Sequence, residues 1–389
     1  MATKRGPLGL AKSAKKNKRS KRTTEPEEEA EETFEIPEDV DPDDELGQLF
    51  ALYDNIDKSD PWDPRIFHAI VHECDRILRN SESSELPARF HVAYARALFM
   101  LASFAKIKKK SKTKSKKPDR VTEEGPEDFI QAALERSAIG LEQYPDSFEL
   151  RFSRCRYRVA FATLKLTESI DDESVTTCVP RLQEINEDFV ETVKLSETSS
   201  EAMLTNAASP AEAVTNLLTD VSKLYEMTFE SDSLLKQNPE LYTWVITQWQ
   251  RKLDQDPDNK SLHRALGEFL LSRSHPHVRK AEENMESEIE SSNDEVAIAV
   301  ETLKDALEQL CAAETEDDSE LMVVIAEAQV SLANLTEDVE EQEKLYAKAI
   351  DRLKRAQALG GEDFSEMIAE LQGDGNDGDD NSDDKDEEN

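Results

Sequence analysis

The sequence predicts an all-α protein: an irregular array of antiparallel helical repeats, of the TPR-like or HEAT-like solenoid type, with disordered charged termini. Three observations support this fold class. Apolar residues recur at helical spacing along most of the chain between residues 46 and 372. No two alternating apolar runs are joined by Asn-Gly or Asp-Gly, so a β-hairpin signal is missing. Aromatic residues make up 6% of the chain and charged residues 34%, a composition typical of long amphipathic helices.

The first element is an arm, residues 1–45, that consists of two blocks of opposite charge. Residues 1–24 contain nine Lys/Arg and no acid, whereas residues 25–45 contain thirteen Asp/Glu and no base. Blocks of like charge repel themselves and bury little apolar surface, so we expect this arm to be disordered.

The basic block resembles a bipartite nuclear localisation signal, in which extended basic side chains bind in acidic grooves of an importin. The residues of the predicted signal are Lys4, Arg5, Lys15, Lys16, Lys18, Arg19, Lys21 and Arg22. The alternative is an unspecific basic arm or a ribosome-binding tail. A mitochondrial presequence is disfavoured because Gly6-Pro7 interrupts any amphipathic helix.

The body, residues 46–372, is predicted to be helix after helix, joined by short polar turns. Some helix ends are clearly marked: Ser209, Pro210 and Glu212 form a capping box with proline at the first helical position, and Gly360-Gly361 closes the helix before it. The expected helices span residues 44–57, 64–80, 87–105, 127–144, 147–168, 180–196, 210–230, 239–254, 259–273, 294–313, 319–334, 337–359 and 363–371.

The stretch 253–270 resembles the junction between two tetratricopeptide repeats. Pro257 breaks one helix, and Gly267 follows where close helix contact requires a small residue. Residues 140–152, which contain Pro145, resemble such a junction more weakly. Pro145 and Pro257 are 112 residues apart, which is not a multiple of the repeat length of about 34. The repeats are therefore expected to be irregular.

Two further charged segments belong to the organisation of the chain. Residues 106–120 form a basic insert without aromatic residues, which predicts a flexible electrostatic loop or a second import signal rather than a reader of RNA sequence. Residues 373–389 contain nine acids and one Lys, and we expect a disordered acidic tail.

The overall charge and hydropathy exclude several classes of function. The formal net charge is −37, which disfavours bulk attraction to nucleic acid or anionic lipid and favours basic partners. No apolar run reaches the length of about 18 residues that a membrane span needs. The four cysteines, Cys74, Cys155, Cys178 and Cys311, lie far apart without a CxxC pair, so we expect reduced intracellular thiols.

The stretch 66–78 offers the strongest hint of a metal site, because His68 and His72 lie four residues apart. At about 100° per residue, however, the apolar residues of this stretch share one face and both histidines lie on the opposite, solvated face. A zinc site needs a third or fourth ligand, and Cys74 points the other way. His275 and His277 are predicted to lie in a turn.

Motifs for catalysis are missing. The chain has no GxxxxGK[ST] phosphate loop, no GxGxxG after a strand and no GxSxG elbow, and acidic pairs such as Glu316 and Asp317 are expected by chance in a chain with 85 carboxylates. We therefore predict a protein that is not an enzyme, with no catalytic, cofactor-binding or metal-binding residue.

Three stretches carry a resemblance to a known family: residues 4–16 (KRGPLGLAKSAKK), 41–49 (DPDDELGQL) and 70–79 (IVHECDRILR). They are similar to the fungal enhancer of translation termination family, which includes a nuclear regulator of hypoxic, sterol-linked gene expression. The resemblance implies a nuclear, non-enzymatic protein of α-helical repeats that supports correct translation termination. It also implies a prolyl-hydroxylase-like 2-oxoglutarate dioxygenase as a partner, whose nuclear import it assists; a direct or indirect link to the ribosome stays open.

These observations lead to three hypotheses. The first is a nuclear adaptor and regulator whose acidic helical surface holds a protein partner while the basic arm engages importin. The second is an acidic chaperone for histones or ribosomal proteins, motivated by the surplus negative charge. The third is a metal-dependent enzyme centred on His68 and His72.

Overall fold

A computed structural model describes residues 41, 43–56, 63–80, 85–111, 125–168, 172–199, 209–229, 239–286, 293–360 and 362–372. These residues form thirteen α-helices and no strand. The helices are α1 (Glu45–Asp54), α2 (Pro64–Asn80), α3 (Ala88–Ser111), α4 (Pro126–Gln143), α5 (Phe148–Glu168), α6 (Asp172–Thr198), α7 (Pro210–Glu226), α9 (Pro239–Gln255), α10 (Lys260–Glu286), α11 (Asn293–Ala313), α12 (Ser319–Asn334), α13 (Val339–Ala358) and α14 (Ser365–Leu371). None of these helices is both long and apolar enough to cross a bilayer.

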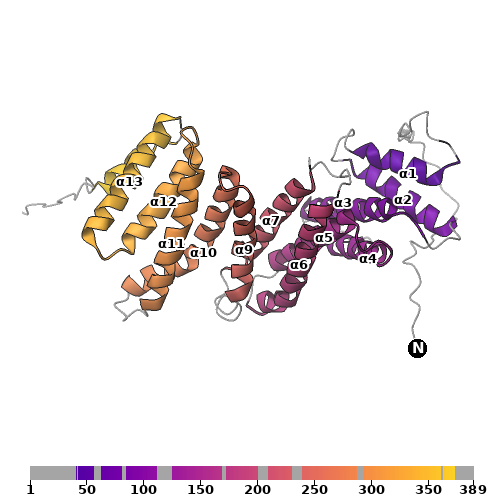
Figure 1. Cartoon of the computed structure of the whole chain (residues 1–389), viewed down its shortest axis with the longest axis horizontal. Coiled ribbons are helices and arrows are strands. Elements are labelled where there is room, and N and C mark those ends of the chain that lie inside the picture. Colours follow the sequence, from indigo (N-terminus) through magenta and orange to yellow (C-terminus); the bar gives the residue numbers. More distant parts are fainter. Residues whose placement is uncertain are drawn as a thin grey trace, which may run out of the picture.

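The helices stack along one direction, from α1 at one end of an elongated molecule to α13 at the other (Figure 1). Neighbours in sequence pack as pairs, most extensively α3 with α4, α5 with α6, α10 with α11 and α12 with α13. Each pair therefore contacts mainly the pairs before and after it, which is the organisation of a solenoid. The predicted fold class of irregular antiparallel helical repeats is confirmed.

One side of the stack is packed more closely than the other. Alternate helices touch in the series α1–α3, α3–α5, α5–α7 and α7–α10, whereas α2, α4, α6 and α9 make no alternate contacts of comparable extent. We call the first series the close-packed layer and the second series the open layer. A stack whose alternate helices approach more closely on one side bends toward that side, and solenoids use such concave surfaces to bind partners.

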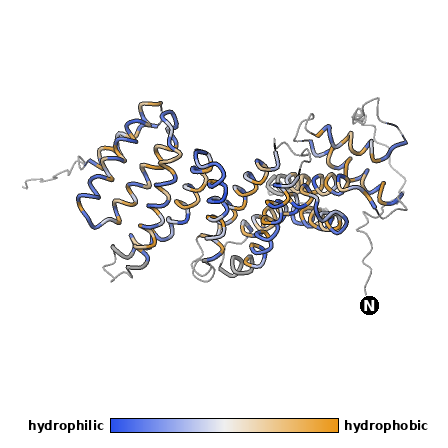
Figure 2. The backbone as a smooth tube through the Cα atoms, in the orientation of Figure 1, coloured by the Kyte–Doolittle hydropathy of each residue, from blue (hydrophilic) through white to orange (hydrophobic). Residues whose placement is uncertain are grey.

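Apolar side chains fill the spaces between the helices in a chain of linked cores. One core joins α1 to α5, the next joins α5 to α10, and a third joins α10 to α13. The hydrophobic turns of the tube face neighbouring helices, and hydrophilic residues lie along its outer edges (Figure 2). Since α5 and α10 each belong to two cores, each of these helices joins the core before it to the core after it.

The marked helix ends lie where the sequence predicts them. Ser209 caps α7 by accepting a hydrogen bond at Oγ from the Glu212 backbone N at 3.2 Å. Pro257 lies in the turn between α9 and α10. A Cβ on Gly267 would lie 2.7 Å from Leu310 Cγ of α11, so the predicted close helix contact is confirmed.

Two prolines lie inside helices rather than at their ends, and this corrects two predicted boundaries. Pro180 lies inside α6, which starts at Asp172 rather than at 180, and Pro276 lies inside α10, which continues to Glu286 rather than ending at 273. His275 and His277 are therefore helical, and the predicted turn is wrong.

Packing explains why α10 continues beyond Pro276. Val278 and Ala281 are buried in the core that α10 shares with α11. His277 Nδ1 lies 2.7 Å from Glu295 Oε2 of α11. This gain offsets the cost of about 3 kcal/mol that proline imposes inside a helix.

The charged segments are described only in part. The N-terminal arm is described at Asp41 and from Asp43 onward. Helix α3 continues into the basic insert as far as Ser111, so the first residues of the predicted loop 106–120 are helical. Residues 112–120 and the acidic tail 373–389 lie outside the described residues.

Candidate protein-binding surface

The predicted nuclear localisation signal lies outside the described part of the chain. All eight of its residues, Lys4, Arg5, Lys15, Lys16, Lys18, Arg19, Lys21 and Arg22, precede residue 41. The assignment therefore stays a prediction.

Helix α2 places the two histidines of the sequence hint on its solvated face. His68 and His72 are exposed, whereas Phe67, Ile70 and Cys74 on the other side are fully buried. Across the described ranges, no three His, Cys, Asp or Glu side chains lie close enough to hold a metal ion. The prediction that the apolar face of this helix is buried and its histidines are exposed is confirmed. The apolar face of α2 packs in the core that joins α1 to α5.

The three cysteines that the structure describes have raised pKa values. Burial raises the pKa of Cys74 and of Cys155, which keeps both side chains in the protonated, weakly nucleophilic form. Burial also raises the pKa of Cys311, whose side chain is exposed at the end of α11. These three sulfur atoms therefore lack the low pKa that distinguishes a reactive cysteine.

Charge differs between the two layers from α3 to α6. In the close-packed layer, α3 carries six Lys/Arg and no acid, and α5 carries five Lys/Arg and two Glu. In the open layer, α4 carries four acids and one Arg, and α6 carries seven acids and two bases. Within this chain of net charge −37, α3 and α5 are thus rich in basic residues and their neighbours α4 and α6 in acidic ones, whereas α1 carries two acids and no base and α2 carries three Arg and two acids.

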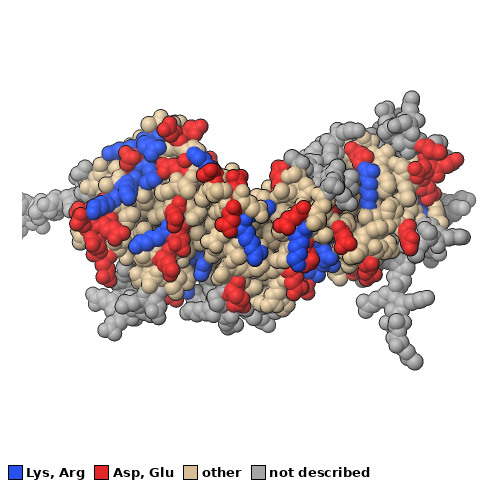
Figure 3. Space-filling model, in the orientation of Figure 1, with Lys and Arg blue, Asp and Glu red and all other residues tan. Residues whose placement is uncertain are grey.

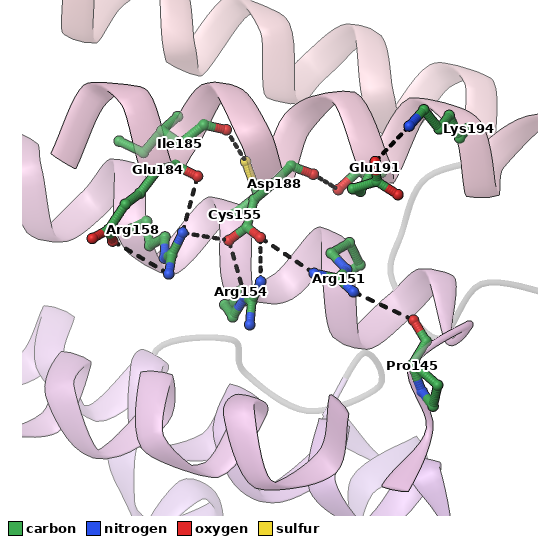
Figure 4. Close-up of polar contacts among 11 residues, drawn as sticks. Pro145, Arg151, Arg154, Cys155, Arg158, Glu184, Ile185, Asp188, Glu191 and Lys194 are labelled. Atoms are coloured by element: carbon green, nitrogen blue, oxygen red, sulfur yellow. Dashed lines mark hydrogen bonds and ion pairs between the residues drawn. The ribbon is translucent and has the colours of Figure 1, made fainter. Parts of the chain in front are cut away.

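Some of the basic groups of α5 are used to hold the layers together. Asp188 of α6 has a side chain only 4% exposed and lies among Arg151, Arg154 and Arg158 of α5 (Figure 4). Arg154 donates from Nε to Asp188 Oδ2 at 2.9 Å and also binds Oδ1 through Nη2. Arg158 Nη1 lies 3.0 Å from Oδ2, and Arg151 Nη1 lies 3.5 Å from Oδ1.

The same arginines also bind backbone carbonyl groups. Arg158 donates to the Glu184 carbonyl at 2.9 Å, and Arg151 donates to the Pro145 carbonyl at 3.4 Å, as Figure 4 shows. Because the guanidinium groups surround a carboxylate that is shielded from water, this cluster stabilises the α5–α6 pair rather than forming an open binding site.

Sequence reasoning missed the Asp188 cluster, although a signal is present. The three arginines recur at intervals of three and four along α5, and Glu184, Asp188 and Glu191 recur at intervals of four and three along α6. Such spacing places each set on one helix face. Only the pairing of α5 with α6 identifies the two faces as partners.

Not all charges of the close-packed layer are used internally. Arg156 of α5 is exposed, and the structure gives it no ion pair with any described residue. Asp220 of α7 is also exposed, yet burial raises the pKa of its carboxyl group. The positive charges of Arg156 and Lys223 act against this shift.

The view in Figure 3 shows acidic and basic side chains interspersed over the whole stack. Basic side chains gather over α13 and again near the middle of the molecule, between acidic ones. This arrangement suits the recognition of a partner with matching charges, because opposed charges across an interface determine specificity more than affinity.

Comparison with known proteins adds an independent line of information. A family described as nuclear pore complex subunit Nro1 matches residues 1–239 and 261–372. A protein of Yarrowia lipolytica named enhancer of translation termination 1 is 33% identical over 318 residues, covering 80% of both chains. Its namesake in Meyerozyma guilliermondii is 28% identical over 393 residues, covering 87% of this chain and 90% of that protein.

A solved structure shares the fold. The S. pombe nuclear import adaptor Nro1 superposes with a TM-score of 0.50 at 19% identity, covering 86% of this chain and 97% of that chain. At this level of identity the likeness concerns the path of the backbone, and it agrees with the helical stack described above.

Proposed function

This chain belongs to the Nro1 family, and from that premise we propose that it is a nuclear adaptor protein, not an enzyme, that acts by binding other proteins and is required for correct translation termination. The resemblance inferred from the three short sequence stretches is confirmed by this membership. Relatives that match most of the chain are named for termination, and the S. pombe protein of the same fold is named as a nuclear import adaptor.

The observation that carries the proposal is the combination of family membership with a solenoid in which α3 and α5 are rich in basic residues and α4 and α6 in acidic ones. An extended stack of helices exposes much surface for its mass, and such surfaces serve recognition of other macromolecules. The described part of the chain also contains no cluster of metal-binding side chains, and its buried thiols have raised pKa values. These features favour binding over catalysis.

In the proposed division of labour, the helical body holds a partner and the basic residues of the N-terminal arm bind importin. Replacing Lys15, Lys16, Lys18 and Arg19 by Gln in the full chain removes four positive charges from the predicted signal. We expect nuclear accumulation to fall while the partner still co-purifies, as measured by fluorescence microscopy and quantitative mass spectrometry in cells lacking the endogenous protein. Simultaneous loss of nuclear accumulation and of the partner would contradict a separation of these roles.

Termination itself is tested with a stop-codon readthrough reporter in the same cells. The full chain is expected to restore low readthrough, and the Gln variant to restore less because it enters the nucleus poorly. Equal rescue by both proteins would indicate that nuclear entry is not needed for the effect on termination.

We further propose that the partner is a prolyl-hydroxylase-like 2-oxoglutarate dioxygenase and that the protein takes part in regulating hypoxic gene expression. This finer assignment comes from the family resemblance. Isothermal titration of the full chain with such a purified dioxygenase should yield a defined stoichiometry. If no heat of binding is found at micromolar concentrations while other nuclear proteins still co-purify, the partner is a different protein.

A second candidate function is that of an acidic chaperone for histones or ribosomal proteins. The observation in its favour is the acidic character of α4 and α6, where α6 exposes Glu184 and Glu191 with side chains 56% and 48% exposed. Binding driven by such charges weakens strongly with salt, because the Debye length falls from about 10 Å at 0.1 M to about 3 Å at 1 M. A partner that remains bound at high salt excludes this function.

A further inference from the structure

The last helix of the stack, α14, is held by a small apolar cluster that is separate from the three larger cores. Ile368 of α14 packs there against α12 and α13 and is 8% exposed. Phe364 and Leu371 contribute to the same cluster and are partly buried. We call the residues that α12 and α13 supply to this cluster the α14-binding face: Val323, Ala326, Val330, Ala349, Ile350 and Leu353.

Helix α14 contacts this face with one apolar side. Phe364 directly precedes the helix, and Ile368 and Leu371 follow at spacings of four and three residues, which place the three side chains together. Glu366 and Glu370 are exposed on the opposite side. Apolar residues at i, i+4 and i+7 are also the pattern by which a protein recognises an amphipathic helix of a partner.

Few interactions hold α14 in place. The helix has seven residues, of which Ile368 alone is buried, and Phe364 at its N-cap makes no side-chain capping hydrogen bond. Gln357 Nε2 of α13 donates to Asp363 Oδ1 at 3.1 Å and to Ser365 Oγ at 3.3 Å. Helices shorter than about 12 residues are marginal in water, so α14 depends on the α14-binding face for its stability. A segment with so few buried contacts opens locally before the helices beneath it unfold.

Helix α14 also lies apart from the packing of the other helices. Within the described ranges, none of its residues belongs to the three larger cores. Gly360, with a φ of +88°, ends α13 and redirects the chain toward α14. The helix can therefore leave its face while α1 to α13 stay packed.

We infer that the α14-binding face is a binding site for an amphipathic helix of a partner protein, and that α14 occupies this site in the free protein until the partner displaces it. This inference rests on the proposed function as an adaptor, for which it names a surface and the chemistry of the partner. Burial of apolar surface drives the contact, so the net charge of the chain does not decide it. A second copy of the chain is the weaker occupant, because it offers only the same α14, against which the tethered α14 competes at an effective concentration in the roughly millimolar range.

The test uses the full chain and a fluorescein-labelled peptide of residues 362–372 as the probe. In Ile368→Glu a charge replaces the one buried side chain of α14, so the helix leaves its face and the probe should bind saturably in fluorescence anisotropy. The wild-type chain should bind the probe about tenfold more weakly, because its own α14 competes. Met367→Glu is the matched control: this neighbouring side chain is 38% exposed, and the variant should behave like wild type.

A substitution on the face itself shows where the probe binds. Val330→Glu added to Ile368→Glu places a charge on the α14-binding face and should weaken probe binding about tenfold. Ile298→Glu added instead changes an isoleucine of α11 that is 38% exposed and should leave probe binding unchanged. The inference is overturned if Ile368→Glu binds the probe no better than Met367→Glu, if Val330→Glu has no effect, or if a peptide of scrambled order binds equally well.

Hydrogen exchange of the wild-type chain tests the release of α14 without any variant. The hydrogen-bonded amides of α14 should exchange about a hundredfold faster than those in the middle of α12 and α13, because they open locally. Equal protection of α14 and α13 would show that α14 leaves only when the whole end of the stack unfolds, and would overturn the inference.

Two further measurements identify the occupant. Light scattering should show the wild-type chain as a monomer, whereas a dimer that Ile368→Glu dissociates would assign the face to a second copy and overturn the inference. If the cellular partner co-purifies equally with Ile368→Glu and with Ile368→Glu/Val330→Glu, the adaptor function stands and the α14-binding face is not its site. If wild-type protein retains no partner at all, the proposed function itself fails.

Discussion

Removing the buried carboxylate of Asp188 should destabilise the α5–α6 pair strongly. Its side chain is 4% exposed, and it is the shared acceptor of Arg151, Arg154 and Arg158. In Asp188→Ala, three positive charges face each other without the carboxylate. Removing one partner of a buried ion pair costs about 3–5 kcal/mol.

The lower end of that range applies here, because the arginine side chains are 19–26% exposed and water can solvate part of their charge. We therefore expect the free energy of unfolding to fall by about 3 kcal/mol. In a helical stack of this size, with about 2.1 cal/mol/K of unfolding entropy per residue, a loss of that magnitude lowers Tm by about 4–5 °C. Asp188→Asn should lose nearly as much, since the amide keeps the shape but not the charge.

Thermal unfolding followed by circular dichroism measures this effect, and urea unfolding checks it. Glu191→Gln is the matched control: its ion pair with Lys194 joins side chains 48% and 63% exposed, so the expected change is below about 1 kcal/mol. A melting temperature for Asp188→Ala within error of the Glu191→Gln value would refute the argument that the cluster holds α5 against α6.

Three further predictions concern other parts of the stack. Gly267→Ala should lower the free energy of unfolding by about 1–3 kcal/mol in urea titrations, because the new Cβ would lie 2.7 Å from Leu310 Cγ; unchanged stability would show that α10 and α11 can separate at no cost. Burial, with Arg136 adding to it, lowers the pKa of His91, so the folded state favours the neutral ring; stability should therefore decline as pH falls below about 6.5, by up to ~1.4 kcal/mol per pH unit, and His91→Leu should show a shallower decline between pH 7 and 5. His68→Ala with His72→Ala should change stability by less than about 0.5 kcal/mol and leave the metal content of the purified protein, measured by mass spectrometry, at the wild-type level.

Much of the fold follows from local sequence signals. The apolar stripe of residues 66–78 is buried as the helical spacing predicts, with Phe67 and Cys74 inside and His68 outside. Cap and break signals such as Ser209 and Pro257 lie at the observed helix boundaries. These features are predictable because a helix of this kind depends on side chains within a few residues of each other.

The failures at proline have the opposite origin. Pro180 carries a local signal to begin a helix and Pro276 a local signal to end one, and both nevertheless lie inside helices. The local cost at Pro276 is outweighed by burial of Val278 and Ala281 against α11, whose first residue lies seventeen positions beyond the proline. A competition between a local cost and a distant contact cannot be decided from the sequence around the proline alone.

The sequence by itself therefore determined the helices, most of their ends, the buried stripe of each and the chemical character of the charged segments. Only the tertiary structure decided which charges meet: that Asp188 is enclosed by three arginines of α5, and that Arg96 and Arg156 lie over rings from two other helices. The reason is physical. Helix periodicity arises from neighbours three and four residues apart, whereas an ion pair or a ring contact between helices depends on how the helices pack, which the spacing within any one helix does not specify.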